Sequence, residues 1–161
     1  MDRGKHTFPW AYTGDSMTFE SEESLVLSFL DLVSQNATPW GEGWKTTQEF
    51  DYSRGRTDVL GLSGSGELFA FEAKLEKWRV ALSQAYRNTC FANRSFVLLP
   101  RPVAERASSS PGEFRRRGVG ICFLDRTKVV VLLDARRTEP IQPWLFDKAA
   151  KTIEESKNPN A

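Results

Sequence analysis

The segments Thr57-Asp58-Val59-Leu60-Gly61-Leu62 and Leu68-Phe69-Ala70-Phe71-Glu72-Ala73-Lys74 decide the fold of this chain. Both are short apolar runs, which are typical of strands buried on both faces. Ser63-Gly64-Ser65-Gly66 lies between them and favours a tight turn. If the two strands pair, Asp58 comes close to Glu72. The sequence therefore predicts a hairpin that brings two acids together at the polar ends of buried strands.

Further elements flank this hairpin on both sides. In the segment before it, Val26, Phe29 and Val33 recur at helical spacing. The predicted elements of this region are a helix over Thr18–Ser34, strands over Lys45–Tyr52, Thr57–Leu62 and Leu68–Lys74, a helix over Trp78–Phe91 and a strand over Ser95–Leu99. Short turns make a meander of the first three strands, and the second helix makes a parallel crossover. The order αβββαβ predicts an α/β fold with a mixed central β-sheet flanked by helices.

The rest of the chain is predicted from its composition. Residues 1–17 are rich in glycine, proline and polar residues and predict an irregular N-terminal segment. Residues 101–117 carry prolines, a serine run and three arginines, and predict a mobile loop or an insertion. The other predictions are a hairpin from Gly118–Leu124 and Lys128–Leu133, a final helix over Pro143–Glu155 and a frayed tail over residues 157–161. A chain of 161 residues with 40% hydrophobic residues predicts a single domain, residues 1–161.

Composition excludes several classes of site. The only histidine is His6, which argues against a histidine-dependent triad or a multi-histidine metal site. Cys90 and Cys122 lie in apolar stretches without zinc-ligand spacing, so we expect neither a disulfide framework nor structural zinc. The formal net charge of +1 neither indicates nor excludes a nucleic-acid partner. With no signal-peptide pattern and no membrane-length apolar stretch, we expect a cytoplasmic protein without a membrane partner.

Asp58, Glu72 and Lys74 form the main chemical constellation. The two carboxylates supply hard anionic oxygens suited to Mg²⁺ or Mn²⁺, and the Ala73 backbone carbonyl is a further candidate ligand. Glu72 and Lys74 are two positions apart, so their side chains share one face of a strand. The lysine ammonium could orient an attacking water or stabilise a charged transition state. This set of groups is suited to phosphodiester hydrolysis without histidine.

The order of elements and the pair Asp58 with Glu72-Ala73-Lys74 resemble the PD-(D/E)xK nuclease superfamily over roughly residues 18–100. Thr57 replaces the proline of the family motif. The resemblance implies a restriction endonuclease-like core and a Mg²⁺-dependent deoxyribonuclease (an endonuclease or an exonuclease) that leaves a 5′-phosphate. It also implies a homodimer where both strands are cut. Because the sequence shows no evident separate target-recognition domain, we expect either a structure-directed nuclease or one whose specificity lies in a recognition partner protein.

Helical residues supply further candidates for the catalytic site. Gln84 lies on the second helix, where branches of the superfamily carry a glutamine; the alternative is an ordinary boundary glutamine. From the first helix we favour Glu22 over Glu23 as an acid near the metal, because Glu22 shares a face with Val26 and Phe29. The alternative is that both acids only complement the helix dipole.

Basic and aromatic residues around the motif are candidates for nucleic-acid contacts. The expected phosphate-binding residues are Arg54, Arg56, Lys77, Arg79 and Arg87. Trp40 and Trp44 could stack on an unpaired base, although such residues more often cover the edge of a core. Arg115–Arg117 could be a further phosphate contact, but a solvated charge run is the favoured interpretation.

Two hypotheses therefore remain from the sequence. In the first, the protein is a metal-dependent nuclease. This hypothesis is favoured because Glu72 follows an apolar run that we expect to be buried, where an acid needs a partner or a metal. In the second, the chain keeps the nuclease fold but only binds nucleic acid or serves assembly, and the acids form a structural network. A simpler alternative, a solvated pair of Glu72 and Lys74 at a strand end, is disfavoured by the apolar run before Glu72.

Overall fold

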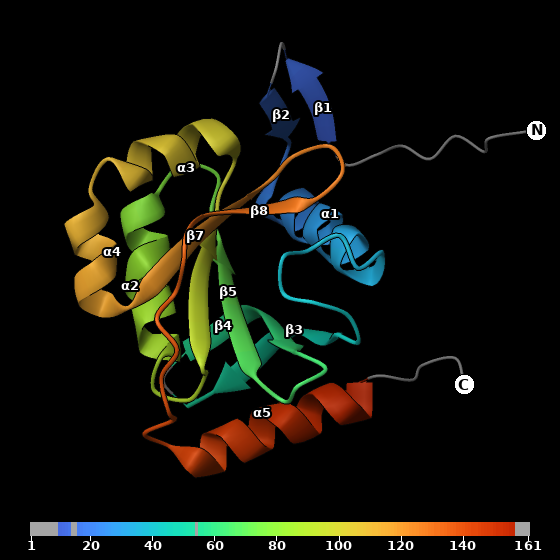
Figure 1. The fold of residues 1–161 in the computed structure, drawn as a ribbon, viewed down its shortest axis with the longest axis vertical. Helices are drawn as coiled ribbons and strands as arrows, with labels where there is room; N and C mark the ends of the chain where they lie inside the picture. The colour runs from blue at the N-terminus through green and yellow to red at the C-terminus, as the bar shows by residue number, and fades with distance from the viewer. Residues whose placement is uncertain (1–9, 14–15, 54, 157–161) are drawn as a thin grey trace, which may run out of the picture.

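The computed structural model describes residues 10–13, 16–53 and 55–156 of the chain. Its centre is a mixed six-stranded sheet in the order β3-β4-β5-β6-β7-β8 (Figure 1). The strands are β3 (Lys45–Tyr52), β4 (Gly55–Leu62), β5 (Leu68–Ala73), β6 (Arg94–Leu98), β7 (Val119–Leu124) and β8 (Val129–Leu133). The helices are α1 (Glu22–Ser34), α2 (Trp78–Asn88), α3 (Arg101–Ser108), α4 (Pro111–Arg117) and α5 (Pro143–Ser156). The predicted α/β fold with its αβββαβ core is confirmed.

Strand pairing follows the connections that the sequence predicts. β3, β4 and β5 are antiparallel neighbours, as a meander requires. β5 and β6 are parallel and are joined by α2, which is the predicted crossover. β6 and β7 are also parallel, and β8 returns antiparallel at the edge of the sheet.

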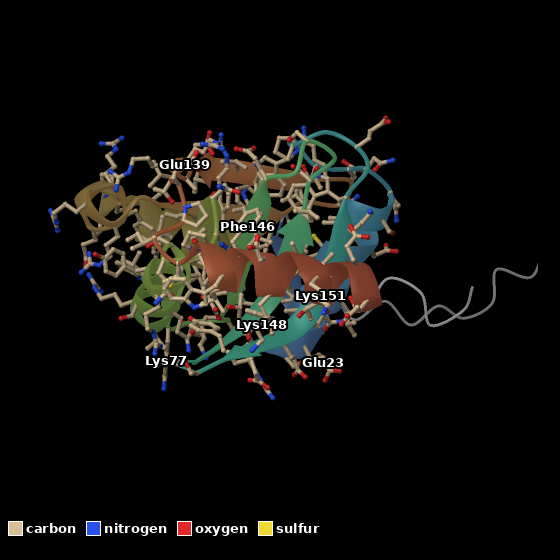
Figure 2. The ribbon with its side chains drawn as sticks, turned by 90° about the horizontal axis from the view of Figure 1, so that it is seen from below. Glu23, Lys77, Glu139, Phe146, Lys148 and Lys151 are labelled. Carbon is tan, nitrogen blue, oxygen red and sulfur yellow. The ribbon has the colours of Figure 1, made fainter. Side chains whose placement is uncertain are left out.

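Helices cover both faces of the sheet, and this determines which side chains meet. α1 packs on one face through a cluster that includes Phe29, Phe71 and Phe96. α2, α3 and α4 cover the other face at one side, and α5 covers it beneath β3 and β4 (Figures 1 and 2). All six residues of β5 are buried, because helices lie on both sides of it. Alternate residues of β5 therefore belong to two separate cores.

The N-terminal prediction is wrong in part. Residues 10–13 and 16–19 form a two-stranded antiparallel sheet, β1 (Trp10–Thr13) with β2 (Ser16–Phe19), in place of the irregular segment predicted to residue 17. The first helix begins at Glu22 and not at Thr18. Ser21 caps it: the Ser21 hydroxyl accepts from the Ser24 backbone N–H at 3.0 Å, and Ser24 caps Ser21 in return. The predicted frayed tail, residues 157–161, lies outside the described residues.

Residues 101–117 are not a loop or an insertion but two helices, α3 and α4. Each has a proline in its first turn, where the missing backbone N–H is tolerated. Val103, Ala107 and Phe114 bury the apolar side of the pair against the sheet. The arginine run is the last turn of α4, where cations complement the helix dipole. The prolines and serines that favour a loop in the sequence thus mark helix starts in the fold.

Trp40 and Trp44 pack into the core on the α1 face. The Trp44 ring lies 4.6 Å from the Phe69 ring, and the Trp40 ring lies 5.2 Å from the Phe96 ring. These contacts support the core-edge interpretation and not base stacking. The close approach of Trp44 to the sheet depends on a glycine, because a Cβ at Gly61 would lie 2.4 Å from the indole ring.

We expect Gly61→Ala to destabilise the fold. The added methyl group would displace Trp44 from Phe69, and overpacking of this kind costs about 1–3 kcal/mol. Chemical denaturation measures the loss. The matched control is Gly112→Ala, whose added methyl group would meet only the end of the flexible Arg116 side chain. Equal stabilities of the two variants would show that the Trp44 contact does not constrain this site.

Candidate active site

Asp58 and Glu72 lie on the same face of the sheet. Val59 pairs with Phe71 in the antiparallel register of β4 and β5. The next residues along the two strands, Asp58 and Glu72, are therefore opposite each other. Their face is the one that α2 and α5 cover, since Leu60, the neighbour of Asp58 on that face, packs in the α5 core. The expected juxtaposition of the two acids is confirmed.

The two acids line a pocket of about 280 Å³. Its walls come from β3, β4, the end of β5 and α2. The lining residues are Tyr52, Gly55, Arg56, Asp58, Glu72, Lys74, Gln84 and Arg87. Residues from distant parts of the sequence therefore converge here, and most of the predicted site residues are among them.

Glu72 is the most perturbed group of the pocket. Its side chain is 1% exposed. Burial first, and the nearby Asp58 carboxylate second, raise the pKa of Glu72 to about 8, while the Asn88 amide and Lys74 act in the opposite direction. Such a shift marks functional sites, where acids share a partly dry environment. A cation between the two acids would favour the ionised form and so oppose the raised pKa.

Asp58 is oriented by the neighbouring strand. The backbone N–H of Ala73 donates to Asp58 Oδ2 at 2.8 Å. This bond fixes one carboxylate oxygen at the end of β5, next to Glu72 and Lys74. Ala73 therefore contributes its N–H to the site, and its carbonyl remains a candidate ligand.

Lys74 connects the pocket to α1. Its Nζ lies 3.3 Å from Glu22 Oε1, and both side chains are partly exposed. Glu22 thus reaches the site through Lys74, and this contact distinguishes it from Glu23, the acid that we disfavoured. The pair is accessible to solvent, so exchange of Glu22 for another anion costs little.

Gln84 faces the pocket with an unsatisfied oxygen. Its Oε1 is buried and has no hydrogen-bond partner among the described residues. A buried acceptor without a donor is costly, which indicates a missing partner. The oxygen would suit a cation or a water held between the carboxylates. The alternative of an ordinary boundary glutamine is less consistent with this position.

Three residues that hold Glu72 were not predicted from the sequence. Asn88 Nδ2 donates to Glu72 Oε1 at 2.9 Å, while the hydroxyls of Thr57 and Tyr52 donate to Asn88 Oδ1 at 2.9 and 3.0 Å. Asn88 lies four residues after Gln84, which places both on one face of α2. This spacing of four residues was the sequence signal that could have identified Asn88. Burial raises the pKa of the Tyr52 hydroxyl, so that it remains a donor.

The expected phosphate-binding residues are only partly brought together. Arg56 and Arg87 line the pocket, and Arg56 also pairs with Asp51 at 3.1 Å. Lys77 and Arg79 do not line it; Arg79 pairs with Glu113 on α4 instead. Figure 2 shows Lys77 near α2, at the edge of the molecule. Arg54 lies outside the described residues.

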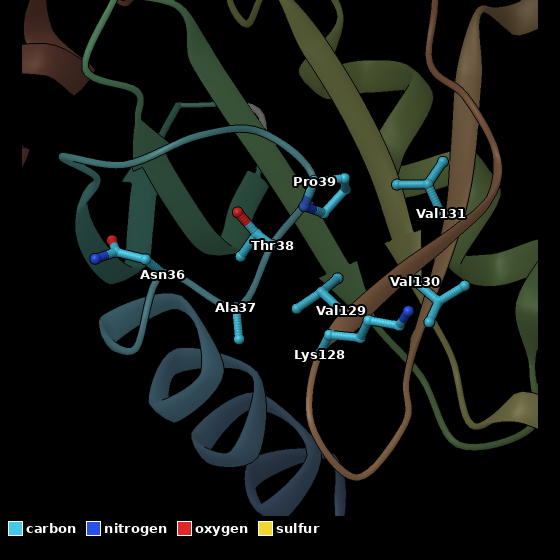
Figure 3. A pocket seen from close by; sticks show the side chains of 8 residues that line it. All are labelled: Asn36, Ala37, Thr38, Pro39, Lys128, Val129, Val130 and Val131. Carbon is cyan, nitrogen blue, oxygen red and sulfur yellow. The ribbon is translucent and has the colours of Figure 1, made fainter.

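A larger cavity, of about 450 Å³, lies elsewhere. Residues 36–39 after α1 and residues 128–131 at the start of β8 line it, among them Ala37, Lys128, Val129 and Val131 (Figure 3). None of its lining residues carries a carboxylate. The smaller pocket, where titratable groups converge, is therefore the candidate active site.

The donor set of the smaller pocket fits one oxygen-seeking cation. Among the described residues no group of three or more histidine, cysteine, aspartate and glutamate side chains could hold a metal. The two carboxylates are supplemented by the orphaned Gln84 oxygen and by the Ala73 carbonyl. Mg²⁺ commonly uses one or two carboxylates and completes its shell with water and substrate. The residues present thus suit Mg²⁺ or Mn²⁺ better than zinc.

Two further findings concern the whole described chain. Neither Cys90 nor Cys122 forms a disulfide among the described residues, and Cys90 Sγ donates to Gln142 Oε1 at 3.2 Å. In the part of the chain that the structure describes, no helix has the length and apolar character needed to span a membrane.

Comparisons with known proteins give similarity at the level of the fold. No family model and no curated protein matches this chain. The structure is similar to a protein of unknown function from Silicibacter pomeroyi, with a TM-score of 0.52 and 18% identity, over 71% of this chain and 74% of that chain. It is also similar to a repair endonuclease from Pyrococcus abyssi, with a TM-score of 0.40 and 18% identity, over 76% of this chain and 49% of that chain. Similarity at this level does not identify a reaction, which depends on the site itself.

We expect the stability of the metal-free protein to fall as the pH rises from about 5 to 8.5. The raised pKa means that folded Glu72 keeps its proton after the unfolded chain has lost it. Its stabilising contribution is complete below the ordinary pKa of 4.5 and is lost as the pH rises through about 8. The loss should exceed about 2 kcal/mol, since each tenfold difference in proton affinity between the folded and unfolded states corresponds to about 1.4 kcal/mol.

Urea denaturation in the presence of a chelator, repeated across this pH range, measures the effect. Glu72→Gln has no proton to lose and should flatten the profile, whereas Glu23→Gln, near the start of α1, should leave it unchanged. A wild-type profile as flat as that of Glu72→Gln would contradict the assignment of a protonated, buried carboxyl.

Proposed function

We propose that this protein is a Mg²⁺- or Mn²⁺-dependent nuclease of the PD-(D/E)xK type that hydrolyses phosphodiester bonds in DNA. The observation that carries the proposal is the convergence of Asp58, Glu72 and Lys74 in one pocket, with Glu72 almost fully buried. A buried acid beside a second carboxylate is unfavourable without a cation, and the adjacent ammonium suits an anionic substrate. These groups, and not the similarity of fold, indicate the reaction.

Each residue has a distinct role in the proposed reaction. Asp58 and Glu72 would hold the cation, with the Gln84 oxygen and the Ala73 carbonyl as candidate further ligands. When bound, the cation would acidify a water molecule and neutralise charge on the phosphate. Attack of the water oxygen on phosphorus would break the bond to the 3′ oxygen, leaving a 5′-phosphate on one fragment, and the 3′ oxygen would take up a proton from solvent to become a 3′-hydroxyl on the other.

Lys74 would act on the charge that develops during attack. It lies two positions beyond Glu72 and lines the same pocket. In the free protein its ammonium pairs with Glu22 at 3.3 Å. A substrate phosphate would replace the Glu22 carboxylate, because the partly exposed pair is weak. Lys74 then stabilises the transition state more than the bound substrate.

Arg56 and Arg87 would bind flanking phosphates at the mouth of the pocket. Both line it, and Arg56 exchanges an exposed ion pair with Asp51 at little cost. This local pair of cations is compatible with a net charge near zero, because the remaining charges are distributed elsewhere. Binding should weaken as salt is raised.

We expect metal-dependent cleavage that requires both acids. Linear, circular, single-stranded and branched DNA, and an RNA control, would be incubated with Mg²⁺, Mn²⁺ or Ca²⁺. The wild type should cleave at least one DNA substrate with Mg²⁺ or Mn²⁺, while Asp58→Asn and Glu72→Gln should lose cleavage and bind Mn²⁺ more weakly by calorimetry. Glu76→Gln, at an exposed acid outside the pocket, is the matched control. Mn²⁺ binding that both site variants retain would remove these carboxylates as ligands, and DNA binding without cleavage would favour the assembly module.

A separate prediction concerns Lys74. Lys74→Ala should reduce single-turnover cleavage by about 10²-fold, the size typical of losing one electrostatic stabiliser. DNA binding measured in Ca²⁺ should weaken much less, because Arg56 and Arg87 remain. Glu22→Gln should retain most activity, since it removes only the resting partner of the lysine. Equal losses of binding and cleavage in Lys74→Ala would assign this lysine to phosphate anchoring instead.

A further inference from the structure

A buried asparagine joins four elements of the fold at the proposed metal site. Asn88 on α2 is fully buried, and so is Thr57 on β4. Its side-chain amide contacts Thr57, Tyr52 on β3 and Glu72 on β5 at distances of 2.9 to 3.0 Å. Asn88 itself is not among the residues that line the pocket. It therefore acts on the pocket through Glu72 and Tyr52, which both line it.

When Glu72 is ionised, as it would be with the proposed cation bound, the direction of these hydrogen bonds has one consistent solution. The carboxylate of Glu72 only accepts when ionised, so the Asn88 amide must turn its NH₂ group toward it. The amide oxygen then faces the two hydroxyls, which both donate to it. A flipped amide would place its oxygen against the carboxylate. The hydroxyls of Thr57 and Tyr52 thus hold the amide in the orientation that Glu72 needs.

We propose that Asn88 is a positioning residue of the metal site: its amide fixes the plane of the Glu72 carboxylate for the cation, and Thr57 and Tyr52 lock that amide. The inference rests on the proposed metal-dependent function. Residues that hydrogen-bond to a metal-ligating side chain, and so orient it, affect metal affinity strongly, although they do not touch the metal. Thr57, the residue that replaces proline in the motif, gains a specific role here, because proline has no hydroxyl to donate.

A second buried asparagine provides a matched structural comparison. Asn93 accepts from the Leu68 backbone N–H at 2.8 Å and donates to the Thr138 carbonyl at 3.1 Å. It joins its own segment to two others, but it contacts no carboxylate in these bonds. Loss of either asparagine should destabilise the fold, whereas only loss of Asn88 should change the metal site.

The experiment measures Mn²⁺ affinity by calorimetry without nucleic acid, together with thermal stability. Asn88→Leu keeps the approximate volume and removes the amide; Asn93→Leu is its control. A second pair differs at residue 57: Tyr52→Phe/Thr57→Val lacks both donors, and Tyr52→Phe/Thr57→Ser keeps one hydroxyl. Circular dichroism selects the folded variants, and the second pair carries the test if Asn88→Leu does not fold.

We expect Asn88→Leu and Tyr52→Phe/Thr57→Val to bind Mn²⁺ about 10- to 100-fold more weakly than the wild type, the usual range for such partners. Asn93→Leu should retain wild-type affinity, and Tyr52→Phe/Thr57→Ser should recover most of it. Wild-type affinity in the first two variants would overturn the positioning role and leave the proposed function intact. Absence of Mn²⁺ binding by the wild type would overturn the proposed metal centre, and this inference with it.

Discussion

The burial of the Glu72 carboxyl is the constraint on which the site depends. β5 lies between helices on both faces, so none of its side chains can reach solvent within the strand. An acid at this position must be protonated, hydrogen-bonded or paired with a cation. The surrounding groups provide a partial solution: Asn88 donates to Glu72, while Asp58 opposes its ionisation. The strand itself is well packed, but the negative charge that Glu72 and Asp58 would carry together is not balanced.

This incomplete solution has a cost in stability. A well-packed apolar residue at Glu72 would remove the desolvation penalty and the repulsion from Asp58, and such replacements are often neutral or stabilising. Natural proteins retain unfavourable arrangements of this kind mainly at functional sites. The unsatisfied Gln84 oxygen in the same pocket is also an unfavourable arrangement. Both features would become favourable if the proposed cation occupied this pocket.

The sequence predicted the parts of the fold that depend on local pattern. The apolar runs beside Asp58 and Glu72, with a glycine-rich turn between them, were sufficient to predict the hairpin and the meeting of the two acids. Residues 101–117 were misjudged, because proline and serine begin helices as well as loops. The hairpin from Trp10 to Phe19 was missed because its segment lacks a strong alternation. Asn88 was missed because its partners lie on three other elements, and only the folded chain brings them together.

The geometry also bears on the hypothesis that the acids are only a structural network. A structural network should satisfy its members, as Asn93 does between Leu68 and Thr138. The pocket differs in three respects: Glu72 is driven toward its protonated form, Gln84 keeps an unpaired oxygen, and Lys74 is held by a solvent-accessible partner that a phosphate can displace. Each of these becomes more favourable when a cation and an anion are added together. That combination is what a metal-bound phosphodiester supplies, and a binding module without metal would leave the first two unresolved.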